Sequence, residues 1–367
     1  MFLSTMDDGT SIGQARKIPY QNLASRSVMC RLPSMFLNPS SHGSMPSPKR
    51  DAEVKSHYSV QFFSDANEHG RSLANLVQNY FQIEKGRFHS TLRQIELDGI
   101  HAFNERANCD IVQCGAVLPS AVALAWTVPA LASGASDRTH GGRMHSGLKR
   151  GGGDWMYRVA ADMEVAGFTM PAVEFDRLVE PLGFPATRSA SRHIRFMHDS
   201  HAFSVLRSGF DELKNHVEHL DREEVRAVLR KQLLDGIFCA LQEAEVAGRP
   251  NLTRQTYNDI VKRSQDLVLG NPEYPPSVLD VCTELRVCRR TLQTSFTRVM
   301  GMSPSSYLRK IRLGGVRRLL RSVPASQMTI GEAAARWGFF HLGSFSNDYR
   351  QFFCELPSQT LRFGAGH

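Results

Sequence analysis

The sequence predicts an α+β protein, with an antiparallel β-sheet domain towards its N-terminal end and an all-α domain at its C-terminal end. Three observations predict this. Short apolar runs separated by turn residues occupy residues 58–209, a helical period begins at Phe210, and a repeated segment fills the last third of the chain. Short strands at such spacing are typical of antiparallel sheets or barrels, and a long internal repeat indicates one structural unit used twice.

The first 57 residues differ in composition from the rest. They are rich in Ser, Met and Pro and show little periodicity, as in LPSMFLNPSSHGSMPSPKR. Such a composition predicts a disordered leader or an over-extended start. The stretch 14–50 is rich in Arg and Ser and poor in acids, which leaves an organellar transit segment open as an alternative.

The sequence also indicates in which cellular compartment the protein is expected. No apolar run approaches the ~18 residues that a membrane-spanning helix needs. Asp7 and Asp8 stand where a secretory signal carries positive charge, which argues against export. The seven cysteines include no C-x-x-C pair, so they predict neither a disulfide framework nor a zinc cluster. We therefore expect a cytoplasmic protein, in a reducing compartment.

Residues 58–209 carry the signals of a sheet domain. In FHSTLRQIELDGIHAF, Leu92, Ile95 and Leu97 suggest strand alternation, and the apolar stretch 121–132 is expected to form sheet core. Turn signals follow at 98–99, 133–134 and 151–154. The pattern predicts a small antiparallel sheet domain or barrel.

Residues 210–250 change to a helical period followed by a linker. One stripe contains Leu213, Val217 and Leu220, and a second contains Val225, Leu229, Leu233, Ile237 and Leu241. The two predicted helices pack on each other within one chain or contribute to a homodimer surface, and the pattern leaves both open. The segment GRPNLTR, 248–254, is the expected linker to the last domain.

The net charge of +8 is unevenly distributed. Residues 251–367 hold 16 Lys and Arg against 8 Asp and Glu, which leaves 28 of each kind for residues 1–250. The whole positive excess therefore lies in the last third, as expected if that third contacts a polyanion.

The repeat within residues 251–367 has an offset of 52, which becomes 53 after one added residue. It aligns VLDVCTELRV (278–287) with IGEAAARWGF (330–339), and GMSPSSYLR (301–309) with CELPSQTLR (354–362). The matched apolar pairs are Val278 with Ile330, Val281 with Ala333, Leu285 with Trp337, Val287 with Phe339, Leu292 with Phe345, and Phe296 with Tyr349. The chain is thus expected to carry one structural unit twice.

The pattern of each copy predicts a helix, a tight turn and a second helix. The turns are expected at 286–287 and at Gly338, and the second copy restarts near His341. Two short helices joined in this way form a helix-turn-helix, whose second helix lies in a major groove. Ser303 and Pro304 predict the start of an 18-residue connecting helix, about 27 Å long. That length suits two such units in adjacent major grooves, which lie roughly 34 Å apart.

The segment VCRRTLQTSF (287–296) has the pattern of a reading helix. Leu292 and Phe296 are expected to face inward together, which turns Arg289, Arg290, Gln293 and Thr294 outward. Arg and Gln side chains have the geometry to bind base edges. A basic exposed face alone is common, so this prediction depends on the repeat around it.

The same residues resemble a known family. The strings RRTLQTSFTRVMGMSPSSYLRKIRL, TIGEAAARWGFFHLGSFSNDYRQFF and PSQTLR are similar to the DNA-binding domain of AraC/XylS-type transcription regulators, over roughly 256–362. WGFFHLGSFSNDY resembles the regulators of ethanolamine-utilisation operons. The resemblance implies an N-terminal, cupin-like sensor or effector domain and a seven-helix DNA-binding domain with two helix-turn-helix units. It also implies promoter DNA and RNA polymerase as partners, and gene activation in response to a small molecule.

The resemblance also implies which residues contact DNA. Its base-reading positions fall on Arg290, Gln293 and Thr294 in the first unit, and on Leu342, Gly343, Ser346 and Asn347 in the second. We expect phosphate contacts from Arg289, Arg298, His341 and Arg350. Two departures stand out. Cys288 replaces a better-capping Ser, and Leu342 and Gly343 have no side-chain hydrogen bonds to offer a base.

Other chemistry is not predicted. His140 with His145, and His198 with His201, lack the clustered carboxylates of a metal site, and GLKRGGGD lacks the order of a phosphate loop. Some regulators of the resembled type are DNA alkyl-transfer enzymes, but the cysteines around Cys109 and Cys114 are too few and too scattered for that chemistry. We therefore expect no enzyme activity, catalytic residue, metal or cofactor.

One alternative function remains open. A constitutive DNA-binding regulator, whose N-terminal domain binds a protein partner, would show the same C-terminal sequence. The sequence identifies neither the effector nor the operator, and a stabilising small molecule would favour the sensor over the partner-binding domain.

Overall fold

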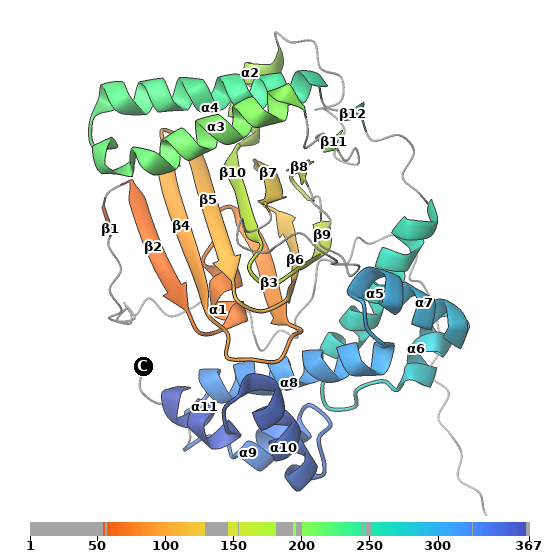
Figure 1. Cartoon of the computed structure of the whole chain (residues 1–367). Coiled ribbons are helices and arrows are strands. Elements are labelled where there is room, and N and C mark those ends of the chain that lie inside the picture. Colours follow the sequence, from red (N-terminus) through yellow and green to blue (C-terminus); the bar gives the residue numbers. More distant parts are fainter. Residues whose placement is uncertain are drawn as a thin grey trace, which may run out of the picture.

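The computed structural model describes residues 54–55, 57–128, 146–152, 154–180, 194–195, 200–243, 245–246, 252–324 and 326–364. Two β-sheets with covering helices form one part of the molecule, and a helical domain lies at one end of the sheets (Figure 1). The predicted order of an antiparallel sheet domain followed by an all-α domain is confirmed.

The larger sheet has nine strands in the order β1-β2-β4-β5-β10-β7-β8-β11-β12, and its neighbours pair antiparallel. Its strands are β1 (Val54–Lys55), β2 (Tyr58–Phe63), β4 (Ser90–Leu97), β5 (Ile100–Ala107), β7 (Ala121–Val128), β8 (Ser146–Arg150), β10 (Glu164–Pro171), β11 (Ile194–Arg195) and β12 (Glu245–Val246). The turn predicted at 98–99 joins β4 to β5. Asp98 and Gly99 both have positive φ there, 44° and 90°, a conformation that glycine adopts without steric cost.

The smaller sheet has the order β3-β6-β9 and is also antiparallel. Its strands are β3 (Leu76–Gln82), β6 (Ile111–Val117) and β9 (Asp154–Val159), and the short helix α1 (Ala66–Arg71) precedes it. Tyr80, Phe88, Leu92 and Phe103 belong to a core between the two sheets. A buried polar group lies beside this core, where Glu105 accepts hydrogen bonds from Tyr80 (2.9 Å) and Gln113 (2.6 Å) and His69 lies 2.9 Å away.

Helices cover the other face of the larger sheet (Figure 1). They are α2 (Ala172–Val179), α3 (His201–Asn215) and α4 (Glu223–Glu243), with the 3-10 turn η4 (Val217–His219) between the last two. The helical period expected from Phe210 thus starts nine residues earlier in the chain. Phe203 and Leu206 continue the apolar stripe of Phe210 and Leu213 at helical spacing and pack in the same core, so the sequence interpretation placed the start of the helix too late.

The apolar stripe of α4, which the sequence left open as a possible homodimer surface, is buried inside the sheet domain. Leu229, Leu233, Ile237 and Leu241 are at most 4% exposed and pack in the core that α3, α4 and the sheet share. Of the two alternatives that the pattern left open, the intrachain helix pair is the one observed for these residues.

The helical domain contains α5 (Leu252–Gly270), α6 (Val278–Leu285), α7 (Arg289–Met300), α8 (Pro304–Ser322), α9 (Ile330–Ala335), α10 (Leu342–Phe353) and α11 (Pro357–Gly364). The part of the expected linker from Leu252 onward is therefore helical. The core residues matched by the repeat are confirmed in most cases. Val281, Ala333, Leu292, Phe345, Phe296 and Tyr349 are at most 1% exposed, and Leu285, Trp337 and Phe339 are at most 9% exposed. Val278, Ile330 and Val287 are half-buried and pack against the same cluster.

Several expectations fall at the edge of the described residues or outside them. Most of the predicted leader lies outside, but β1 begins at Val54, inside the range assigned to it, and pairs with β2. The turn at 133–134 lies outside, as do His140, His145 and His198. Among the described helices, none is long and apolar enough to cross a membrane.

Candidate nucleic-acid interface

The first helix pair is α6 and α7, joined at a left-handed residue. Ser277 and Asp280 form a capping box that starts α6, with Asp280 N–H donating to Ser277 Oγ at 3.2 Å. Arg286 then adopts φ 54°, which ends α6 and turns the chain into α7. The turn predicted at 286–287 is confirmed.

The N-cap of α7 is Cys288, the position that the sequence marked as weak. Its Sγ accepts a hydrogen bond from the Thr291 N–H at 3.5 Å and lies 3.2 Å from the Thr291 hydroxyl. These two contacts lower the pKa of the Cys288 thiol below its ordinary value, the hydroxyl contact being the larger cause. The sulfur therefore serves as a cap, and the helix begins where the repeat predicts.

The outward face of α7 carries the residues expected to read DNA. Leu292 and Phe296 are buried, whereas Arg289, Arg290 and Gln293 are exposed and Thr294 is half-buried. Gln293 donates to Thr297 Oγ1 at a long 3.4 Å. No acidic partner for Arg289 or Arg290 occurs in the described parts of the chain, so both guanidinium groups are available to a ligand. Arg298 is exposed too, and its guanidinium lies 5.4 Å from the Tyr257 ring centre.

The second helix pair is α9 and α10. Thr329 and Glu332 form a second capping box, at the position equivalent to Ser277 and Asp280 in the repeat. Gly338 makes the predicted turn with φ 70°, a conformation that favours glycine. A side chain at this position would also collide with the Pro275 ring. His341 occupies the N-cap of α10 but its side chain makes no capping hydrogen bond.

The exposed face of α10 is less polar than that of α7. Leu342 is 49% exposed and Asn347 is exposed, while Ser346 is half-buried. Open space surrounds the Cα of Gly343, so packing does not require glycine at this position. The missing side chain leaves the first turn of α10 open to close approach by a ligand. His341 and Arg350 lie exposed at the two ends of the helix.

The connecting helix α8 fixes the second pair in position. It has 19 residues and begins at Ser303 and Pro304 as predicted, which makes it about 28 Å long. The Trp337 ring packs so tightly on Gly315 that a Cβ there would lie 2.3 Å from it. Arg312 donates to the carbonyl oxygens of Trp337 (2.8 Å) and Gly338 (2.7 Å) at the end of α9. Gly315 and Arg312 were not predicted from the sequence, although a Gly-Gly pair inside an amphipathic helix signals close packing.

A second set of arginines on α8 contacts the sheet domain rather than solvent. Arg317 forms ion pairs with Asp65 and with Glu355 (2.9 Å), Arg318 donates to Asn67 Oδ1 (2.9 Å), and Arg321 pairs with Glu68 (3.1 Å). Burial raises the pKa of Asp65, but the nearby Arg317 and Arg321 charges outweigh burial and hold that pKa below its ordinary value. Part of the positive excess of residues 251–367 therefore binds α1, so the charge count overstates what is available to a polyanion.

The two domains also share apolar core and backbone contacts. Phe81 and Ile83 belong to the same buried cluster as Leu308 and Phe352. Gly86 N–H donates to the carbonyl of Phe352 at 2.9 Å. The helical domain is thus held against the sheet domain by packing as well as by charge, as the position of α8 below the strands shows (Figure 1).

The two thiols considered for enzyme chemistry are structural. Cys109 is 3% exposed, and burial raises the pKa of its thiol to about 11, so it stays protonated at neutral pH. Cys114 is also 3% exposed and accepts a hydrogen bond from Gln265 Nε2 at 3.4 Å. Neither has the exposed thiolate that a nucleophile requires.

Comparison with known proteins identifies the last domain. A family model described as a helix-turn-helix domain matches residues 281–362. The "Probable thc operon regulatory protein" of Rhodococcus erythropolis is 38% identical over 131 residues, 35% of this chain and 39% of that protein. The "XylDLEGF operon transcriptional activator 3" of Pseudomonas putida is 31% identical over 115 residues, 30% of this chain and 35% of that protein.

One solved structure is also similar to part of this chain. An AraC-type transcriptional regulator from Chromobacterium violaceum is 27% identical, with a TM-score of 0.28, and the match covers 30% of this chain and 97% of that one. The chain spans well under two thirds of the two curated relatives described above. What these comparisons establish is a C-terminal helix-turn-helix domain similar to those of operon regulators.

Proposed function

We propose that this chain is a transcription regulator of the AraC/XylS type, which binds promoter DNA sequence-specifically through residues 251–367. The observation that carries the proposal is the coincidence of two independent facts. The segment similar to helix-turn-helix domains, 281–362, contains the helix α7, and that helix presents Arg290 and Gln293 outward without acidic partners among the described residues. These are the side chains best suited to bind base edges in a major groove.

The proposal includes two reading units. α6 with α7 forms the first helix-turn-helix, and α9 with α10 forms the second. The base-reading residues are Arg290, Gln293 and Thr294 in the first and Leu342, Gly343, Ser346 and Asn347 in the second, and the phosphate contacts are Arg289, Arg298, His341 and Arg350. The length of α8 supports this arrangement, since about 28 Å lies close to the spacing of successive major grooves.

The sheet domain is assigned the regulatory role within this proposal. It is a cupin-like sensor of a small molecule, and the regulator activates transcription in the cytoplasm through contact with RNA polymerase, alone or as a homodimer. Support for activation comes from the printed name of the Pseudomonas putida relative. The relatives described above regulate other operons, so they give no support to the ethanolamine-utilisation subgroup that the sequence resembles.

A binding-site selection with the full chain and random duplex DNA tests the proposal. We expect an enriched sequence with two conserved blocks about one helical turn apart. Recovery of only random sequence, from a folded protein at physiological salt, would contradict sequence-specific binding. Heparin elution at the same salt provides the reference for non-specific binding to a polyanion.

A further inference from the structure

The two proposed reading helices end in the same way, and the sheet domain contacts both ends. Gly301 ends α7 with φ 71°, and Cys354 ends α10 with φ 55°. These two residues are equivalent in the repeat, 53 residues apart. The last carbonyl groups of a helix have no partner within it and lie at the negative end of its dipole, so they favour N–H donors and cations.

Arg158 of β9 supplies the donor at the end of α7. Its Nη1 donates to the Met300 carbonyl oxygen at 3.0 Å, and its Nε donates to Asp110 Oδ2 at 3.0 Å. The side chain of Arg158 is 19% exposed and that of Asp110 15%, so little water competes for these bonds. Glycine at position 301 leaves room for the guanidinium group, since a Cβ there would lie 2.5 Å from Nη1.

The loop between β3 and β4 supplies the donors at the end of α10. Gly86 N–H donates to the Phe352 carbonyl oxygen at 2.9 Å, and Arg87 Nε donates to the Cys354 carbonyl oxygen at 3.4 Å. Both reading helices therefore have their C-terminal carbonyl groups bound by the sheet domain.

The two sets of donors lie at one end of the smaller sheet. Gln82, at the end of β3, pairs with Ile111 of β6, and Ile111 pairs with Val159, the neighbour of Arg158 on β9. The ladder hydrogen bonds hold these strand ends side by side. The ends of α7 and α10 are thus attached to a single edge, which faces the helical domain (Figure 1).

The connecting helix α8 is expected to bend most easily in its middle. Gly314 and Gly315 are adjacent there, and glycine is less favourable than alanine in a helix interior. Pairs of such small residues are common points of helix bending. The Trp337 ring packs on Gly315, but a Cβ at Gly314 would meet nothing within 4 Å, so packing does not stiffen the helix at that residue.

The sheet domain contacts α8 on both sides of this glycine pair. Before the pair, Lys310 Nζ donates to the Ile83 carbonyl oxygen at 2.6 Å. After the pair, Arg317 forms its ion pair with Asp65, and Arg318 contacts the same helix α1. A bend of α8 at the glycine pair would separate one of these sets of contacts.

These contacts leave the proposed base-reading residues uncovered. Arg290 lies near the start of α7, and Leu342 and Gly343 begin α10, and all three are exposed. The sheet domain holds the opposite ends of the two helices, at Met300 and Phe352. The arrangement that it holds is therefore one in which both reading helices are open to DNA.

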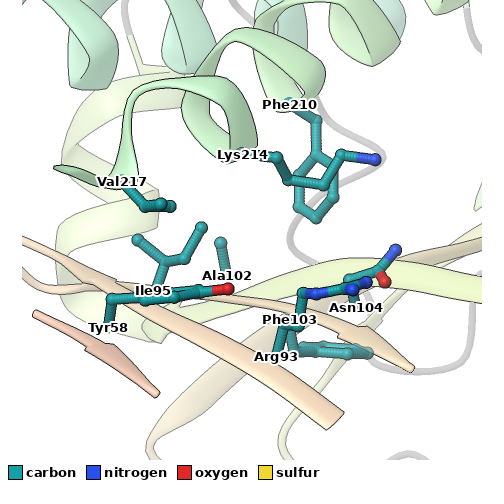
Figure 2. A pocket seen from close by; sticks show the side chains of 9 residues that line it. All are labelled: Tyr58, Arg93, Ile95, Ala102, Phe103, Asn104, Phe210, Lys214 and Val217. Carbon is teal, nitrogen blue, oxygen red and sulfur yellow. The ribbon is translucent and has the colours of Figure 1, made fainter. Parts of the chain in front are cut away.

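A cavity of about 240 Å³ lies elsewhere, below α3 on the helix-covered face of the larger sheet (Figure 2). Polar and apolar side chains share its lining, Arg93 and Phe103 among them. The ammonium group of Lys214 is balanced by Asp211 at 2.9 Å and Glu164 at 3.4 Å. This mixed lining favours no single class of ligand, whereas the contacts with the helical domain come from the smaller sheet, the loop after β3 and α1.

We propose that these interdomain contacts set the distance between the two DNA blocks that α7 and α10 bind, with Arg158 and Lys310 as positioning residues of the first unit. The contacts keep α8 straight and the two units at one separation and one relative rotation. One base pair inserted between the blocks would move the second block by about 3.4 Å and turn it by about 35°, which units held in this way cannot follow. The inference rests on the proposed function and states how the spacing of the DNA site is selected.

Fluorescence anisotropy with the unaltered full chain and the selected DNA site gives the first test. The two blocks are moved together or apart by one and by two base pairs. We expect a shift of two base pairs to weaken binding roughly tenfold or more, the cost of at least one lost base contact. Affinity that is nearly independent of the spacing would overturn the proposal, and this comparison requires no variant to fold.

A release variant, Arg158→Gln with Lys310→Met, removes the polar contacts of the sheet domain with α7 and with the first half of α8. Its loss of affinity over the same spacing series should shrink to about threefold or less. The matched control is Arg106→Gln with Lys231→Gln, which removes the same charge from exposed ion pairs and should keep the full spacing dependence. A release variant as sensitive to spacing as this control would show that α8 alone sets the distance and would refute the proposal. If the double variant does not fold, Lys310→Met alone is compared with Lys231→Met in the same way.

Gly314→Ala tests whether bending of α8 is the motion that the contacts prevent. The added methyl group enters open space, and alanine stabilises the helix. Introduced into the release variant, Gly314→Ala should restore most of the lost spacing dependence. An unchanged tolerance of spacing would refute bending at the glycine pair as the motion.

Amide hydrogen exchange without DNA separates this inference from the proposed function. In the release variant, amides of α8 around residues 311–316 should exchange roughly tenfold faster, as expected for the loss of a hydrogen bond to a charged group, and the control should not change. Faster exchange without any sequence-specific DNA binding would refute the regulator and leave the interdomain support of α8. Specific DNA binding with exchange and spacing dependence both unchanged would refute the interdomain support and leave the regulator.

Discussion

Arg290 and Gln293 lie three residues apart on α7, slightly less than one helical turn, and share an exposed face. Leu292 and Phe296 on the opposite side are buried and fix the orientation of that face. Arg289 is equally exposed but precedes Arg290 at the start of the helix. Adjacent helical positions point in different directions, so the two arginines cannot both enter a groove in the same way. We propose that Arg290 contacts a base and Arg289 a phosphate.

This assignment predicts different behaviour for two substitutions of the same residue type. Arg290→Ala should cost about 1–3 kcal/mol at its cognate base pair and relax the preference there. Arg289→Ala should weaken binding to all sequences alike and reduce the slope of log affinity against log salt by about one unit. Fluorescence anisotropy with the selected site and its point variants measures both. Uniform weakening by Arg290→Ala would show that it contacts phosphate.

At the scale of elements, the two proposed reading helices are unequal. At its proposed base-reading positions α7 offers a guanidinium and an amide, while α10 offers Leu342, Gly343 and the half-buried Ser346, with Asn347 as the one exposed amide among these positions. An apolar side chain and an open glycine favour contact with thymine methyl groups, close backbone fit and DNA shape over hydrogen-bonded readout.

We therefore expect Asn347→Ala to relax specificity less than Arg290→Ala. A binding-site selection on the two variants and the unaltered chain compares the information retained at each block of the site. If the strongest base preferences map to the block beneath α10, and Asn347→Ala removes them, the ranking of the two helices is reversed.

The helix α4 supports a prediction about folding. Leu233 is fully buried between α3 and the sheet, so Leu233→Lys would place a charge in an apolar core and should lower the free energy of unfolding by more than about 3 kcal/mol. Val228→Lys on the exposed side of the same helix should change it by less than about 0.5 kcal/mol. Urea denaturation measures both. If the Leu233→Lys protein is stably folded and sediments as a smaller species than the unaltered protein, the interpretation of this stripe as a homodimer surface is supported instead.

In the whole molecule, the contact between α1 and α8 joins the sheet domain to the helix that lies between the two helix pairs. Asp65 and Arg317 are each 8% exposed and pair with each other, so removing either partner leaves a buried charge behind. Asp65→Asn should lower the free energy of unfolding by on the order of 3 kcal/mol. The matched control is Asp176→Asn, at a half-exposed carboxylate paired with Arg150, which should cost at most about 1 kcal/mol.

The pH dependence of that loss follows from the pKa of Asp65. Because the pKa is lowered on folding, the carboxylate stabilises the folded state fully above its ordinary value of 3.8, and this stabilisation is lost as pH falls through the lower folded value. The deficit of Asp65→Asn should thus be constant around neutral pH and shrink below pH 3.8. A deficit that is absent at neutral pH would show that the ion pair contributes nothing to the domain contact.

The internal repeat is the reason that the C-terminal domain was predictable. Its caps, turns and core could be predicted from local sequence signals. Ser303 before Pro304 marks the start of α8, and Gly338 marks the turn between two apolar helices. Each of these signals depends only on residues close by in the chain. The sheet order was not predictable, since β10 pairs with β5 and β7 across long stretches of chain. Strand pairing of this kind depends on tertiary packing that no local pattern encodes.

The candidate site was predictable only in part, for a related reason. Arg290 and Arg317 look alike in sequence, as members of adjacent arginine pairs in basic helices. Arg317 stands four residues after Leu313 and three before Leu320, on the buried stripe of α8, but its partner Asp65 is 252 residues away. Counting charges in the sequence therefore included Arg317 in the positive excess expected to contact DNA. Only its contact with Asp65 in the folded protein distinguishes Arg317 from the exposed Arg290.

We propose that two helix pairs joined by α8 enter successive major grooves and that α7 makes the stronger base contacts. Interference by dimethyl sulfate and by diethyl pyrocarbonate on the selected site tests this directly, because these reagents modify N7 of guanine and of adenine and so block major-groove contacts at both kinds of base pair. The account predicts two clusters of interference about 10 base pairs apart, with the stronger cluster lost in Arg290→Ala. A single cluster, or binding that tolerates methylation throughout the site, would contradict it.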